Sequence, residues 1–170
     1  AVQVFHASYL SELRLLYRMA EHEKAIALVD DIIHGLDEYG DRLHKEHQIE
    51  FYFNLACAYF GAGQVNKALF WLNKVLNDPE PTLRQDIFIY ARLFNLVVHY
   101  ELGNFDLLEY IVRSTFRFLN KRHAAHEVET LLIESIKKMA RAQQPSVKRE
   151  HTLALKNGLP YAPYLWALAV

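Results

Sequence analysis

Residues 51–76 read FYFNLACAYFGAGQVNKALFWLNKVL. In this stretch Tyr52, Leu55 and Tyr59 have the i, i+3, i+7 spacing of an amphipathic helix. Gly61 and Gly63 follow, and glycine supplies the left-handed conformation that commonly ends a helix. A second apolar stripe then runs through Ala68, Leu72 and Val75. The stretch therefore predicts two helices joined by a short turn, which is a helical hairpin.

The same pattern occurs twice more along the chain. The tyrosine of the pattern occurs as Tyr17, Tyr59 and Tyr100, and successive tyrosines are 42 and 41 residues apart. The spacing predicts hairpins at about 4–38, 43–77 and 82–121, and two further helices near 124–142 and 146–157. With only 5 prolines and 6 glycines, the chain lacks the frequent turns of a sandwich or barrel. We expect an all-α fold of about 8 helices.

Residues 51–76 resemble a tetratricopeptide repeat. The conserved positions of that family fall here on Tyr52, Leu55, Ala56, Tyr59, Ala68, Leu72 and Val75. The third hairpin matches less well because Leu108 replaces a small residue, and the first because Arg14 does. The family's repeat is about 34 residues long, so this chain is similar to a divergent, bacterial type with longer repeats. The resemblance implies a right-handed α-solenoid formed by a single domain over residues 1–170, with 124–170 as capping helices and tail.

Members of this family hold proteins or peptides in a concave groove lined by the first helix of each repeat. Carried over, the partner-binding positions are Glu50, Phe53, Asn54, Cys57, Ala91, Phe94, Asn95 and Val98, with Ser8, Ser11, Glu12 and Leu15 in the first repeat. Asn54 and Asn95 would both donate to and accept from a peptide backbone. The alternative is that the phenylalanines belong to the core and the asparagines make local hydrogen bonds.

The charge distribution bears on partners. The net charge is −1, but residues 1–116 carry 10 basic and 16 acidic side chains, whereas 117–156 carry 9 and 4. One interpretation is an acidic partner that binds near Lys137, Lys138, Arg141, Lys148 and Arg149. The other is that these charges belong to solvated helix faces. The basic stripe of a nucleic-acid binder is absent. No apolar run approaches the roughly 20 residues that span a bilayer, so we expect neither nucleic-acid nor membrane binding.

The sequence contains two histidine pairs and one cysteine, the residue types of metal sites and nucleophiles. The pairs His44/His47 and His123/His126 have i, i+3 spacing, but no His-Glu-x-x-His frame accompanies them. Cys57 lies among apolar residues, where a thiol is normally inert, and no Gly-x-Ser-x-Gly elbow is present. The sequence predicts no enzyme, no cofactor and no metal site, leaving a histidine-carboxylate hydrolase as the enzymatic alternative.

The two ends of the sequence add context. Residues 1–10 lack a signal peptide and the single cysteine needs no oxidising compartment, which favours a cytoplasmic location. Ala1 in place of Met suggests a piece of a longer protein, so a peptide-sensing bacterial regulator is an alternative to a scaffold. Residues 159–170 carry no charge and predict burial, either on this chain or in a homodimer.

Overall fold

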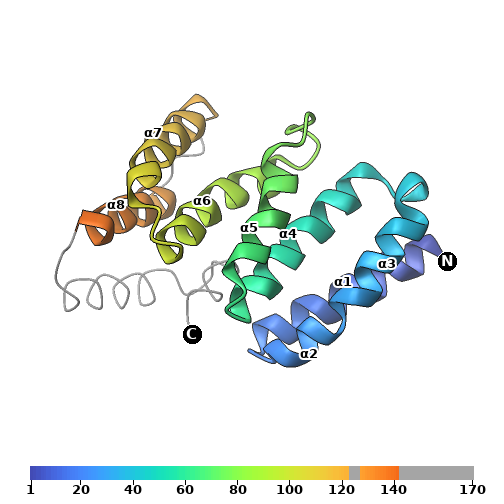
Figure 1. The fold of residues 1–170 in the computed structure, drawn as a ribbon. Coiled ribbons are helices and arrows are strands. Elements are labelled where there is room, and N and C mark those ends of the chain that lie inside the picture. The colour runs from blue at the N-terminus through green and yellow to red at the C-terminus, as the bar shows by residue number, and fades with distance from the viewer. Residues whose placement is uncertain (123–126, 142–170) are drawn as a thin grey trace. The chain divides into compact units, whose positions relative to one another are not determined.

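The computed structural model describes residues 1–122 and 127–141 (Figure 1). These residues form helices and turns with no strand, which confirms the predicted all-helical class for this part of the chain. The elements are α1 (Val2–Arg18), α2 (His22–Ala27), α3 (Val29–Tyr39), the 3-10 helix η1 (Gly40–Arg42), α4 (Lys45–Gly61), α5 (Val65–Leu76), α6 (Gln85–Glu101), α7 (Phe105–Lys121) and α8 (Glu127–Arg141).

Two helix predictions differ from the structure. The second helix of the hairpin expected at 4–38 is divided at Leu28 into α2 and α3, because the Leu28 amide donates to the Ala25 carbonyl in a turn. The helix expected from residue 82 begins at Gln85, after a turn over 81–84. The helix predicted at 146–157 and the apolar tail at 159–170 lie outside the described residues.

The chain divides into two compact units. The first unit is Ala1–Ala91 and the second starts at Arg92, so the boundary falls within α6. The first unit therefore contains α1 to α5 with the start of α6. The second contains the rest of α6 with α7 and α8.

Three turns share one backbone geometry. In each, a residue with positive φ follows the first helix of a hairpin: Ala20 at 58°, Gly63 at 72° and Gly103 at 72°. Its amide donates to the carbonyl three residues back, and the next amide donates to the carbonyl five residues back. This is the Schellman arrangement, which satisfies the last carbonyls of a helix. The residue after it has φ from −88° to −79° and ψ from 55° to 60° in all three turns.

The partner helices repeat the same burial pattern after these turns. The positions 5, 9 and 12 residues beyond each positive-φ residue are buried: Ala25, Val29 and Ile32; Ala68, Leu72 and Val75; Leu108, Val112 and Thr115. The turns are 43 and 40 residues apart. The second hairpin has one more residue between its tyrosine and its turn than the other two hairpins have. The partner helices of the three hairpins therefore align by their turns and not by their tyrosines.

Helix α4 lies at the centre of the first unit, packed against α1 and α5. Its residues from Leu55 to Phe60 are all buried, which is why its apolar pattern extends around the helix rather than along one stripe. Helix α3 packs on α1 where Gly35 faces the ring of Phe5. That ring is surrounded by Tyr9, Tyr39 and Phe51 at centroid distances of 5.3, 5.4 and 5.1 Å.

In the second unit, α7 and α8 pack through apolar faces. The buried side chains are Leu108, Val112 and Leu119 on α7, and Leu132, Ile133 and Ile136 on α8. Arg92 of α6 and Arg122 after α7 each lie about 4 Å from the centroid of the Phe118 ring, at 4.1 and 4.0 Å. None of the described helices is both long enough and apolar enough to cross a membrane.

Candidate functional site

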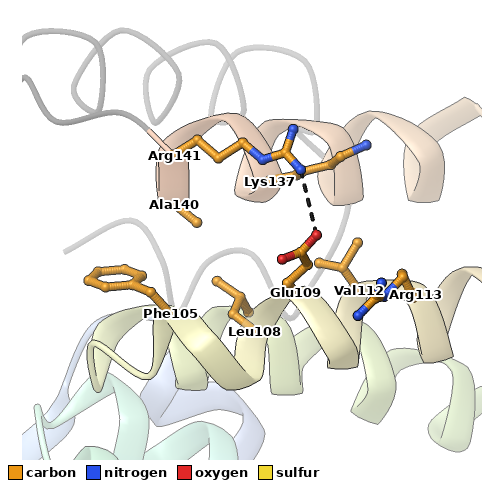
Figure 2. A pocket seen from close by; sticks show the side chains of 8 residues that line it. All are labelled: Phe105, Leu108, Glu109, Val112, Arg113, Lys137, Ala140 and Arg141. Atoms are coloured by element: carbon orange, nitrogen blue, oxygen red, sulfur yellow. Dashed lines mark ion pairs between the residues drawn. The ribbon is translucent and has the colours of Figure 1, made fainter.

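Helices α7 and α8 enclose a pocket of about 280 Å³ (Figure 2). It is lined by Phe105, Leu108, Glu109, Val112, Arg113, Lys137, Ala140 and Arg141. The α7 members include positions i, i+3, i+4 and i+7, and the α8 members are i, i+3 and i+4, so each helix contributes one face. Helix α7 starts directly after the Gly103 turn, which fixes where this face begins.

The pocket combines an apolar interior with a charged rim. Leu108 and Val112 are buried, while Phe105 is 42% exposed. Among the lining residues, Arg113, Lys137 and Arg141 are positively charged and Glu109 is the one carboxylate, while Lys137 Nζ also lies 3.4 Å from Oε1 of Glu134, which is not part of the lining. In Figure 2 the Glu109 carboxylate points from α7 toward Arg141, and the charged atoms are 3.8 Å apart. Both side chains are about two-thirds exposed, at 64% and 66%, so this ion pair contributes little stability and separates at little cost.

Further apolar side chains are exposed on the same unit. Leu107, Tyr110 and Phe116 of α7 and Leu131 of α8 are between 41% and 59% exposed. Single exposed apolar residues are ordinary, but several large ones on one helix are a feature of contact surfaces. This part of the chain therefore offers both a pocket and apolar surface on the helix that forms it.

The groove positions taken from the family resemblance lie mostly in the interior. Glu50, Asn54 and Cys57 on α4 are buried, as are Ala91, Phe94 and Val98 on α6. Phe53 and Asn95 are intermediate. In the first repeat Ser8, Ser11, Glu12 and Leu15 are exposed on α1. The carried-over positions thus identify an open face on α1, but on α4 they are buried residues, and Glu50 and Asn54 bond to side chains of α1.

Asn54 has its hydrogen-bonding groups occupied within the first unit. Its Oδ1 accepts from Tyr17 Oη at 2.9 Å and from Arg14 Nε at 3.2 Å, and its Nδ2 donates to the Glu50 carbonyl at 2.7 Å. This arrangement fits the interpretation that Asn54 makes local hydrogen bonds. It does not fit the interpretation that Asn54 is free to bind a peptide backbone. Phe94, being fully buried, fits the core interpretation in the same way. Asn95 has a shielded Oδ1 with no hydrogen-bond partner among the described residues.

Glu50 is the centre of a polar cluster between α1 and α4. Its Oε1 lies 2.7 Å from Arg14 Nη2 and 3.3 Å from Arg84 Nη1, and its Oε2 lies 3.0 Å from His6 Nε2. Burial by itself raises the pKa of Glu50, but the hydrogen bonds from Arg14 and His6 outweigh it, and the net pKa is lowered. The carboxylate is therefore held ionised. Arg14, which departs from the small residue of the repeat pattern, is explained by this contact.

No sequence pattern indicates that His6 belongs to this cluster. His47 joins the cluster, with Nδ1 3.7 Å from Glu50 Oε2, but its i, i+3 partner His44 does not. His6 comes from α1, 44 residues before Glu50, so no local spacing could indicate it. The pair His123/His126 lies outside the described residues. Cys57 is fully buried and burial raises its pKa to about 12, which is consistent with an inert thiol.

Comparison with protein-family models, with curated proteins and with solved structures gave no match for this chain.

Proposed function

We propose that this chain is a binding module for a protein or peptide, and that the α7–α8 pocket takes an apolar side chain flanked by a carboxylate. The observation that carries the proposal is the apolar interior of the pocket beneath a rim of three cations and one anion. The repeated hairpins support it as well, since stacked helical hairpins commonly serve as binding surfaces. The tetratricopeptide resemblance points to the same class of function.

The size of the pocket favours a peptide side chain over a cofactor. Its volume of about 280 Å³ is below the roughly 300–1,000 Å³ of pockets for drug-sized ligands. Leu108 and Val112 would contact the apolar side chain, because they form the buried floor. An adjacent carboxylate would pair with Lys137 and Arg141, replacing the exposed contacts of Arg141 with Glu109 at 3.8 Å and of Lys137 with Glu134 at 3.4 Å.

The rim charge defines the preferred partner. With three cations and one anion the pocket has an excess of positive charge, so a basic peptide of the same apolar content should bind less well. The chain's own segment 159–170 contains no charged side chain. It therefore lacks the side-chain carboxylate that Lys137 and Arg141 would pair with.

A peptide panel tests the proposal. Labelled peptides carrying leucine or phenylalanine flanked by glutamates are titrated with the protein by fluorescence anisotropy, beside matched peptides in which lysine replaces glutamate. We expect the acidic peptides to bind about tenfold more tightly at low salt, since two pairings of about 0.7 kcal/mol each give that factor. The segment 159–170, supplied as a peptide, serves as a competitor.

Competition by that segment alone, with equal binding of acidic and basic peptides, would contradict the proposed partner. It would favour exchange of the apolar segment between copies, which a size measurement of the protein would then reveal.

A further inference from the structure

Three side chains near the start of α4 bring metal-binding atoms together. Within the described part of the chain, His6, His47 and Glu50 form a group whose ligand atoms all lie within 4.8 Å of one another. His47 and Glu50 are one helical turn apart on α4, and His6 reaches them from α1. The three side chains are 17%, 37% and 12% exposed, so the group is shielded but open to solvent on one side.

Two of the three separations are close to those of a zinc site, and the third, between the ligand atoms of His6 and His47, is at most 4.8 Å. Bonds of about 2.0–2.2 Å in tetrahedral geometry place neighbouring ligand atoms about 3.4 Å apart. The distances of Glu50 Oε2 to His6 Nε2 and to His47 Nδ1 are 3.0 and 3.7 Å, on either side of that value. Two imidazoles and one carboxylate are also a ligand set that Zn²⁺ takes, with water completing the coordination.

The surroundings hold these ligands in place. Oε1 of Glu50 is bound by Arg14 and Arg84, which leaves Oε2 facing the histidines. The His6 ring stands at 86° to the Phe51 ring with centroids 5.6 Å apart, and it lies over the His47 ring with centroids 3.7 Å apart and planes at 33°, so packing orients it, and a shared ion requires the two imidazoles to turn their nitrogens toward Glu50 Oε2. Nδ1 of His47 is shielded from solvent and has no hydrogen-bond partner among the described residues. A buried ring nitrogen of this kind calls for a partner, and a metal ion would be one.

We infer that His6, His47 and Glu50 form a Zn²⁺ site that joins α1 to α4. Three protein ligands leave at least one coordination position for water. Because the ligands come from two helices, a bound ion stabilises their packing and so favours the folded chain. The two guanidinium groups on Oε1 repel the ion and weaken its binding, which predicts moderate affinity.

The test uses the full chain, purified without a histidine tag and freed of metal with a chelator. Zn²⁺ is titrated against a fluorescent chelator of known affinity, and thermal unfolding is followed by circular dichroism with and without the ion. We expect one Zn²⁺ per chain that is lost in His6→Ala and His47→Ala, with at least a tenfold weaker affinity in each. The melting temperature should rise with Zn²⁺ in the parent protein and not in these two variants.

His34→Ala is the matched control, because His34 is exposed on α3 and is not in the group. It should bind Zn²⁺ as the parent does. Arg84→Gln should bind Zn²⁺ several-fold more tightly, since it removes a repelling charge from Oε1 while leaving all three ligands. Equal Zn²⁺ affinity in the parent, His6→Ala and His47→Ala would overturn the inference, as would the absence of any binding in a folded parent protein.

Discussion

Gly35 lies where α3 passes close to α1, and its replacement by alanine should destabilise the first unit. A Cβ at this position would come under 3.0 Å from three carbons of the Phe5 ring. That ring is buried and has aromatic neighbours on α1, α3 and α4, so it has little room to move. Overpacking of this kind costs about 1–3 kcal/mol.

The higher helix propensity of alanine opposes this loss of stability, but its contribution is smaller. Alanine in a helix interior is favoured over glycine by about 1 kcal/mol. Because the clash involves three atoms of an enclosed ring, we take the upper part of the overpacking range, which gives a net loss of about 2 kcal/mol. Gly40→Ala is the control: a Cβ there meets nothing within 4 Å and φ is −49°. This variant should gain about 0.4–1 kcal/mol.

Urea unfolding followed by far-UV circular dichroism measures both changes. Phe5→Leu should cost less in the Gly35→Ala background than in the parent, because the smaller side chain removes the clash. A Gly35→Ala protein as stable as the parent, or more so, would refute the packing of α3 on α1 described above.

Three further predictions concern the first unit. Ala20→Gly should raise the free energy of unfolding by about 0.5–1 kcal/mol, because a non-glycine residue at φ 58° is strained; a loss in the same urea assay would show that Ala20 is not left-handed. Tyr17→Phe should lower the free energy of unfolding by about 1 kcal/mol, because the hydrogen bond to Asn54 is lost. An unchanged urea midpoint would argue against that hydrogen bond. Cys57, with its pKa raised to about 12 by burial, should react with a thiol reagent at neutral pH only as fast as the chain opens, whereas rapid labelling without denaturant would contradict its burial.

The helices were predictable because their causes are local. Glycines with positive φ at Gly63 and Gly103 end two first helices, and the apolar spacing around Leu72 and Val112 sets the partner helices. The first turn gave a weak signal because Ala20 takes the same conformation without being glycine. There the fold overrides the preference of the residue, which sequence patterns do not reveal.

The functional residues were less predictable because they depend on contacts distant in sequence. The groove positions were carried over from the family pattern within each repeat, and on α4 that pattern points to Asn54 and Cys57, which lie in the interior. The approach of His6 to Glu50 depends on how α1 packs on α4. The basic residues Lys137 and Arg141 were noted from charge alone, but their pocket exists only because α8 packs on α7.

The central claim is that Lys137 and Arg141 select an acidic partner at the α7–α8 pocket. The most direct measurement is the peptide preference of Lys137→Glu/Arg141→Glu beside Arg117→Glu/Lys121→Glu, which makes the same charge change at exposed α7 positions outside the pocket lining. The account predicts that the first double variant binds the lysine-bearing peptide more tightly than the glutamate-bearing one, while the second keeps the parent's preference. The same preference in both double variants would contradict it.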